Sequence, residues 1–291
     1  MRAAPAAPDG LLVVDKPAGW TSHDVVGRTR RLAQTRKVGH AGTLDPMATG
    51  VLVLGIGRAT RLLGHLALTG KTYEATLRLG ATTVTDDAEG AVLQTRDASA
   101  VTDHALDAAL RALTGDLLQV PSSVSAVKID GVRSYARVRA GEAVELRARP
   151  VTVSRFSLLA RRGDDVDVLV ECTSGTYVRA LARDLGAALG VGAHLTALRR
   201  TRVGPFALDQ ARTLEALAEH LAVVPLDQAV AAGFPRRELD EQEAVDLSYG
   251  RKLSPSRLPG AVGAFAPDGR CVGLLEDADD RARALVVFAP A

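Results

Sequence analysis

Hydrophobic and polar positions along the chain form patterns that predict strands and helices. Residues 11–15 (LLVVD) and 51–56 (VLVLGI) are short apolar runs bounded by turn residues, which is typical of buried strands. Between them, Thr21 or Ser22 can cap a helix, because a hydroxyl at that place accepts a hydrogen bond from a free backbone N–H. The apolar stripe of that helix is Val25, Val26, Leu32 and Ala33.

The same patterns continue through the middle of the chain. Residues 71–80 (KTYEATLRLG) alternate as a half-buried strand does, and residues 81–90 are a polar loop. Further predicted elements are helices near 58–68 and from Asp103, short strands within 117–129, a strand pair at 151–160 and 166–172, and a helix from Gly175 to Gly190.

The order of these elements predicts the fold class. Strands and helices follow one another without a steady βαβ rhythm, which favours an α+β fold with a mixed, largely antiparallel sheet and flanking helices. The pattern changes near 233–235, after which turn residues are frequent and helical periods are few. We therefore predict a large domain over residues 1–235 and a small β-rich domain over residues 236–291.

Composition and charge add a second observation. The chain has 291 residues, of which 47% are hydrophobic and 24% charged, which is ordinary for a folded protein, and its net charge is only +2. Residues 236–291 hold eight basic and ten acidic residues, so residues 1–235 carry a net charge of +4. Basic residues gather without acids between Asp24 and Asp45 and between Asp184 and Asp209. Such clusters either bind phosphates or are solvated faces.

Cysteines and apolar runs indicate the compartment. Cys172 and Cys271 lie far apart with no CxxC pattern, and the first ten residues contain no apolar signal region. No run approaches the roughly 20 apolar residues needed to span a bilayer. We expect a reduced, cytoplasmic protein with no membrane partner.

Several common motifs are nearly matched but fail. GHLALTGKT (64–72) has one residue too many for a phosphate-binding loop, and GIGRAT (55–60) ends in threonine where a dinucleotide fingerprint needs Gly or Ala. Asp86 and Asp87 are adjacent on a polar loop and are interpreted as turn formers. The histidines form no HxH or HExxH pair, so no metal site is expected; they are His23, His40, His65, His104, His194 and His220.

The segment KVGHAGTLDPMATGVL (37–52) has a different character. Pro46 biases Asp45 away from helical geometry, so the carboxylate can project from a defined extended backbone. Gly42 permits turns that other residues resist, and His40 adds a polar ring nearby. On spacing alone, a structural turn capped by the aspartate explains this segment equally well.

Five segments, in order, resemble the TruB family of tRNA pseudouridine-55 synthases. GHAGTLDPMATGVL resembles the catalytic loop of that family, and LLVVDKPAGWTSHDVV resembles its KPxGxTS opening. The other three are KTYEATLRLG with DDAEG, QVPSSVSAVKIDGVRSYARVRAG (119–141), and CTSGTYVRALARDLGAALGVGAHLTALRRTRVGPF (172–206). The tail, including SYGRKL (248–253), resembles the C-terminal PUA-type RNA-binding domain only loosely.

The resemblance implies a pseudouridine synthase fold and an isomerase of tRNA processing. Uridine-55 in the T-loop of tRNA is detached from its ribose, rotated and rejoined through carbon, with no cofactor, metal or ATP. The implied partner is the T-arm of tRNA, without a guide RNA, and we expect a monomer.

Site residues follow from the matching positions. Asp45 is the implied catalytic carboxylate, and His40, Tyr73, Tyr177 and Leu198 are implied to contact the flipped nucleotide. Arg179 is implied to pair with Asp45, since a neighbouring guanidinium keeps a buried carboxyl ionised; a surface arginine at a helix start is the alternative. The basic residues expected to contact RNA are Arg28, Arg31, Arg36, Lys37, Arg199, Arg200 and Arg202.

Three other functions remain open at this stage. The first is a tRNA-binding folding chaperone whose catalysis is incidental. The second is a guide-RNA-dependent pseudouridine synthase subunit of the same superfamily, and the third is a nucleotide-dependent enzyme that uses residues 64–72. Activity on bare tRNA separates the stand-alone enzyme from the guide-dependent one.

Overall fold

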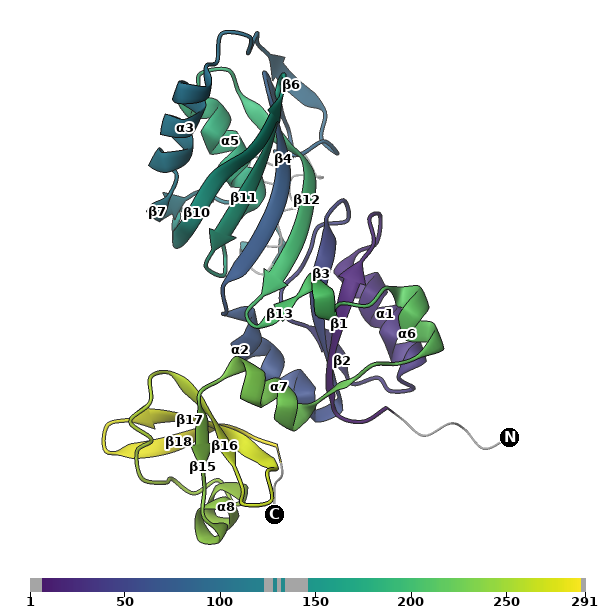
Figure 1. The fold of residues 1–291 in the computed structure, drawn as a ribbon, viewed down its shortest axis with the longest axis vertical. Coiled ribbons are helices and arrows are strands. Elements are labelled where there is room, and N and C mark those ends of the chain that lie inside the picture. The colour runs from purple at the N-terminus through teal and green to yellow at the C-terminus, as the bar shows by residue number, and fades with distance from the viewer. Residues whose placement is uncertain (1–6, 123–127, 130–131, 134–145, 289–291) are drawn as a thin grey trace. The chain divides into compact units, whose positions relative to one another are not determined.

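The computed structural model describes residues 7–122, 128–129, 132–133 and 146–288 (Figure 1). The chain divides into two compact units. The first unit consists of Met1–Pro46, Gly50–Leu68 and Val203–Ala291, and the second of Met47–Thr49 and Thr69–Arg202. Residues 117–129 and 119–141, named above, lie only partly within the described residues.

The first unit is built around two apolar strands. Strand β1 (Gly10–Lys16) pairs antiparallel with β3 (Thr49–Ile56), with Val13 opposite Val53, and its other edge carries β14 (Val224–Pro225). The short strand β2 (Val38–His40) adds to β3. Both apolar runs predicted as buried strands are confirmed, because their side chains are almost fully buried.

Helices cover these strands. Helix α1 (Ser22–Leu32) is capped by Thr21, whose hydroxyl accepts from Asp24 N while the Asp24 carboxylate accepts from Thr21 N. The predicted helix near 58–68 is a 3-10 helix, η1 (Gly57–Leu62), followed by α2 (Leu63–Ala67). After residue 203 come β13 (Phe206–Ala207), η2 (Leu208–Gln210), α6 (Leu214–Glu219) and α7 (Leu226–Gly233).

The C-terminal segment forms a sheet of its own within the first unit. Its strands are β15 (Arg236–Glu238), β16 (Ala261–Phe265), β17 (Cys271–Ala278) and β18 (Arg281–Val287), in that order, with β15 parallel to β16 and the others antiparallel. Helix α8 (Glu241–Ser248) packs on this sheet through Leu247. Phe265, Leu274 and Phe288 share a core with α2 and α7, so the β-rich segment is joined to the preceding residues by apolar packing.

The second unit has a sheet in the order β12-β4-β11-β10-β7. These strands are β4 (Lys71–Leu79), β7 (Gly115–Gln119), β10 (Arg149–Arg162), β11 (Asp165–Cys172) and β12 (Ala193–Val203). The pairings of β11 with β4 and β10, and of β10 with β7, are antiparallel, as the α+β prediction requires. The alternation predicted for β4 is confirmed, since Tyr73 and Leu77 are buried and Glu74 and Arg78 are exposed.

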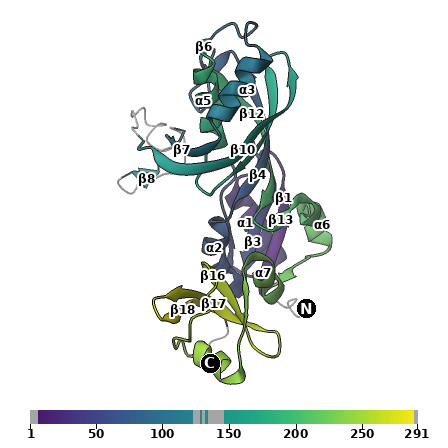
Figure 2. The ribbon, with the colours of Figure 1, turned by 60° about the vertical axis from the view of Figure 1, so that its left-hand side comes forward.

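Two helices lie beside that sheet, α3 (Asp103–Ala112) and α5 (Val178–Ala188), and Figures 1 and 2 show them next to one another. Thr102 caps α3 through its side chain, so this helix begins where the sequence predicts. Helix α5 begins at Val178 rather than at Gly175, because Gly175 has a φ of +89° and belongs to a turn. Short pairs β5 (Ala81–Thr83) with β6 (Val92–Thr95), and β8 (Lys128–Ile129) with β9 (Val132–Arg133), complete the described elements.

Candidate active site

Asp45 lies on the loop between β2 and β3, and the residue before it is fixed to helix α1. The Ser22 hydroxyl accepts a hydrogen bond from Leu44 N at 2.9 Å and donates to Leu44 O at 3.1 Å. Ser22 is buried at the start of α1, so both bonds are shielded from water. One side chain therefore satisfies both backbone groups of the residue that precedes Asp45.

The residue after Asp45 is fixed from the other direction. Lys16, fully buried at the end of β1, donates from Nζ to the carbonyls of Pro17 (2.9 Å), Trp20 (2.6 Å) and Pro46 (3.2 Å). The Pro46 carbonyl also accepts from Gly19 N at 2.9 Å. A buried ammonium needs oxygen acceptors, and one of them here is the carbonyl oxygen of Pro46, the residue after Asp45. The half-buried Asp45 thus stands between two anchored neighbours.

His40 lies near the same loop, at the end of β2. Its ring meets the ring of His23, on α1, edge to face with centroids 5.6 Å apart. A surface groove of about 440 Å³ adjoins His23 and is lined by Trp20 and Arg31 among others. The predicted contact residues His40 and Arg31 and the catalytic candidate Asp45 all belong to the first unit.

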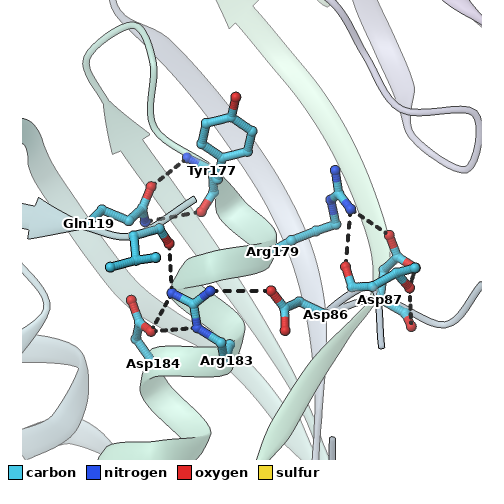
Figure 3. Close-up of polar contacts among 9 residues, drawn as sticks. Asp86, Asp87, Gln119, Tyr177, Arg179, Arg183 and Asp184 are labelled. Atoms are coloured by element: carbon cyan, nitrogen blue, oxygen red, sulfur yellow. Dashed lines mark hydrogen bonds and ion pairs between the residues drawn. The ribbon is translucent and has the colours of Figure 1, made fainter. Parts of the chain in front are cut away.

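In the second unit, Arg179 holds a buried carboxylate. Its Nη1 lies 3.3 Å from Asp87 Oδ2 and donates to Thr85 O at 3.0 Å (Figure 3). Only 7% of the Arg179 side chain and 4% of the Asp87 side chain are exposed. Arg179 is therefore not the surface arginine that was the alternative at the start of α5, although its predicted pairing with Asp45 stays a prediction.

Asp87 is one residue whose role at this site the sequence did not reveal. Its Oδ1 accepts from Glu89 N at 3.0 Å and from the Thr85 hydroxyl, which is the behaviour of a turn former as predicted. The turn interpretation was incomplete, because the other oxygen meets Arg179 from α5. No local sequence pattern predicts the contact, since Asp87 and Arg179 lie far apart in the sequence.

The neighbouring Asp86 has a different environment. It lies 3.4 Å from Arg183 Nη1, and burial raises the pKa of its carboxyl although hydrogen bonding from Ser122 and the charge of Arg183 oppose that shift. Arg183 also contacts Asp184 at 2.8 Å (Figure 3). The acidic pair at 86 and 87 is thus divided between two arginines of one helix.

Tyr73 and Leu198 lie on strands of the same unit. Tyr73 is 7% exposed on β4, opposite Val170 of β11, and Leu198 is 8% exposed on β12. Leu198 lines a groove of about 550 Å³ together with Arg199, Glu74, Thr76, Asp167 and others. Two positions before Tyr73, burial lowers the pKa of Lys71 to about 8.

The basic residues expected to contact RNA differ in exposure. Arg31, Arg36, Lys37 and Arg202 are exposed, and Arg28 and Arg199 are half-buried. Arg199 donates to the Thr49 hydroxyl at 3.3 Å, and Arg202 to the Thr72 hydroxyl at 3.2 Å. Arg200 is only 1% exposed, and we do not retain it as a phosphate contact.

In the part of the chain that the structure describes, no three His, Cys, Asp or Glu side chains gather as a metal site would require. No described helix has the length and apolarity needed to cross a membrane.

Comparison with known proteins identifies the family. The model of the TruB family pseudouridylate synthase N-terminal domain matches residues 30–178. Two C-terminal models follow, that of the tRNA pseudouridylate synthase B C-terminal domain at 179–231 and that of tRNA pseudouridine synthase II at 234–289. Proteins named tRNA pseudouridine synthase B are 62% identical in Arthrobacter sp. (97% of both chains) and 60% identical in Thermobifida fusca (97% of this chain, 99% of the other). The chain belongs to the TruB family.

Solved structures also resemble this TruB chain. A Cbf5-Nop10-Gar1 complex matches with a TM-score of 0.75 at 26% identity, over 97% of this chain and 85% of the other. An H/ACA RNP bound to a substrate RNA containing 2'-deoxyuridine matches with a TM-score of 0.74 at 25% identity, over the same shares. The pseudouridine synthase fold of the TruB chain is thereby established, and with it the fold class predicted from the sequence.

Proposed function

We propose that the protein converts uridine-55 in the T-loop of tRNA to pseudouridine, with Asp45 as the catalytic carboxylate. The observation that carries this proposal is the loop itself: a family-matching GTLDP sequence whose aspartate stands between two residues anchored by Ser22 and Lys16. Relatives about 60% identical over nearly the whole chain, each named tRNA pseudouridine synthase B, support the substrate.

The reaction sets the demand on Asp45. Pseudouridine is an isomer of uridine: the N1–C1′ bond breaks, the uracil turns, C5 bonds to C1′, C5 loses its proton and N1 gains one. A carboxylate serves such a reaction as nucleophile or as base. Either role needs an ionised, fixed carboxylate, and the anchoring of Leu44 and Pro46 restricts where that of Asp45 can point.

The remaining site residues are proposed to hold the nucleotide. Reaching C1′ requires the uridine to leave its stack, which costs a few kcal/mol. Stacking on an aromatic ring returns about 1–3 kcal/mol per base, and Tyr73 and Tyr177 are our candidates for that ring. Leu198 is proposed as the apolar platform, His40 as a contact to neighbouring nucleotides, and Arg179 as the cation that keeps the catalytic carboxylate ionised.

We further propose a stand-alone cytoplasmic monomer with two functional segments. Residues 1–235 would carry catalysis and residues 236–291 would bind RNA as a PUA-like domain. Relatives near 60% identity over nearly the whole chain, each named tRNA pseudouridine synthase B, favour the stand-alone enzyme, since the H/ACA RNP and Cbf5-Nop10-Gar1 structures match at only 25–26% identity.

The test uses the purified protein and a tRNA transcript with no guide RNA or accessory protein. Mass spectrometry should find one pseudouridine, at position 55, and none in a transcript carrying cytidine there. Absence of product with a folded protein that binds tRNA would reject the stand-alone enzyme. Product only after a guide RNA is added would establish the guide-dependent alternative.

A further inference from the structure

Gln119, a buried residue at the end of β7, is hydrogen-bonded to Tyr177, the N-cap residue of helix α5. The Gln119 carboxamide donates from Nε2 to Tyr177 O at 3.1 Å, and its Oε1 accepts from Tyr177 N at 2.8 Å (Figure 3). Gln119 is 3% exposed, and it precedes Tyr177 by 58 residues. One side chain therefore occupies both backbone groups of Tyr177, as a neighbouring strand would.

Helix α5 lacks the local cap that would otherwise fix its start. Tyr177 is the N-cap residue, with φ −103° and ψ 110°, and no side-chain capping bond is formed there. An N-cap usually carries Ser, Thr, Asp or Asn, whose oxygen restrains the first turn. Here the restraint on the cap residue comes from Gln119, and Arg179 is two residues further along.

A second link ties the same strand end to α5 independently. Arg183 donates from Nη2 to Val120 O at 2.8 Å and lies 3.4 Å from Asp86 (Figure 3). The α5 helix therefore stays attached to β7 when the Gln119 amide alone is altered. We therefore expect a variant at Gln119 to alter the direction of the first turn of α5 more than the fold.

We propose that Gln119 is a positioning residue for pseudouridine formation, an inference that rests on the proposed function. Its carboxamide fixes the backbone of Tyr177 and thereby the direction in which the Tyr177 ring and the Arg179 guanidinium leave the start of α5. Displacement of a catalytic group by about 1 Å costs on the order of 100-fold in rate, so loss of this restraint lowers the rate of the chemical step and leaves tRNA affinity nearly unchanged.

The first test compares Gln119→Leu with Gln210→Leu. Gln210, which is exposed, is the control for loss of a glutamine-to-backbone hydrogen bond, because its Oε1 also accepts a backbone N–H, from Ala207 at 3.1 Å, in the other unit. Under single turnover with saturating enzyme, Gln119→Leu should slow pseudouridine formation about 10- to 100-fold, with the tRNA Kd within about twofold and Gln210→Leu unchanged. A wild-type rate for Gln119→Leu overturns the proposal, and so does a fall matched by equal loss of tRNA binding.

The second test, Gln119→Glu, remains decisive if the leucine variant does not fold. A protonated carboxyl both donates to Tyr177 O and accepts from Tyr177 N, whereas a carboxylate only accepts. The rate of Gln119→Glu relative to wild type should therefore be near one at low pH and fall about tenfold as the introduced carboxyl ionises. A ratio that is independent of pH contradicts the proposal. Failure of the proposed function would look different, because the wild-type protein itself would then form no pseudouridine.

Discussion

Removing the negative charge of Asp87 is the perturbation for which the structure gives the clearest expectation. Its carboxylate lies 3.3 Å from the Arg179 guanidinium, and the two side chains are 4% and 7% exposed. Asp87→Asn keeps an oxygen that can accept from Glu89 N and removes the charge that faces Arg179. Asp87→Ala removes both.

The magnitude follows from burial. Breaking a buried ion pair by deleting one partner costs about 3–5 kcal/mol, because a charge stays in a poorly solvated place. We expect Asp87→Asn to lose about 3 kcal/mol in the free energy of unfolding, and Asp87→Ala about 1 kcal/mol more for the hydrogen bonds it loses. Adding Arg179→Met to Asp87→Asn should restore part of the loss, with a coupling energy of about 1–3 kcal/mol.

Urea unfolding of the single and double variants measures that coupling, and Asp86→Asn is the matched control. Because burial raises the pKa of Asp86, its charged form is disfavoured in the folded state, and the neutral amide should cost little. The φ of +59° at residue 86 also suits asparagine. If the losses in unfolding free energy of Asp87→Asn and Arg179→Met add to within about 0.5 kcal/mol in the double variant, the two side chains do not stabilise each other as a buried ion pair.

Three further predictions follow from other contacts. Ser22→Ala removes both hydrogen bonds to Leu44, so it should lower the free energy of unfolding in urea by about 1–3 kcal/mol. It should also slow pseudouridine formation, and an unchanged rate would show that these bonds do not hold Asp45 in place. Burial lowers the pKa of Lys71 from 10.5 to about 8, so the unfolded state binds more protons than the folded state between those pH values. The free energy of unfolding should therefore rise with pH across that range. The rise should be smaller in Lys71→Met, and an identical dependence of stability on pH in that variant would contradict the lowered pKa. Affinity for tRNA should fall as salt rises, and in filter binding Arg31→Ala should reduce the slope of log affinity against log salt concentration by about one. A wild-type affinity that does not depend on salt would contradict phosphate binding by these basic residues.

Elements with strong local patterns could be predicted from the sequence. The buried runs of β1 and β3, the alternation of β4 and the hydroxyl cap of α1 each depend on neighbours within a few residues. Helix α8, in a segment where few helical periods were expected, was not foreseen because its apolar face is narrow, with Leu247 its one fully buried residue.

The site was predicted less completely, for a physical reason. Asp45 and Arg179 could be named from motif matches, but Asp87 and Gln119 act through contacts formed only when distant segments fold together. Asp87 fulfils its local turn role and its ion pair at once, so the local signal concealed the second role. Gln119 ends a strand, where nothing in the adjacent residues indicates that its amide reaches the start of α5.

The Asp45 carboxylate is proposed to perform the isomerisation, and the single-turnover yield of pseudouridine-55 by Asp45→Asn tests that role directly. Asparagine preserves the size of the side chain and should leave tRNA binding and folding intact, with no detectable product. Asp97→Asn alters an exposed aspartate on a loop, which accepts hydrogen bonds from the backbone and hydroxyl of Ser99, and it should retain full yield. Product formation by Asp45→Asn at a rate near that of wild type would show that the Asp45 carboxylate is not the catalytic group.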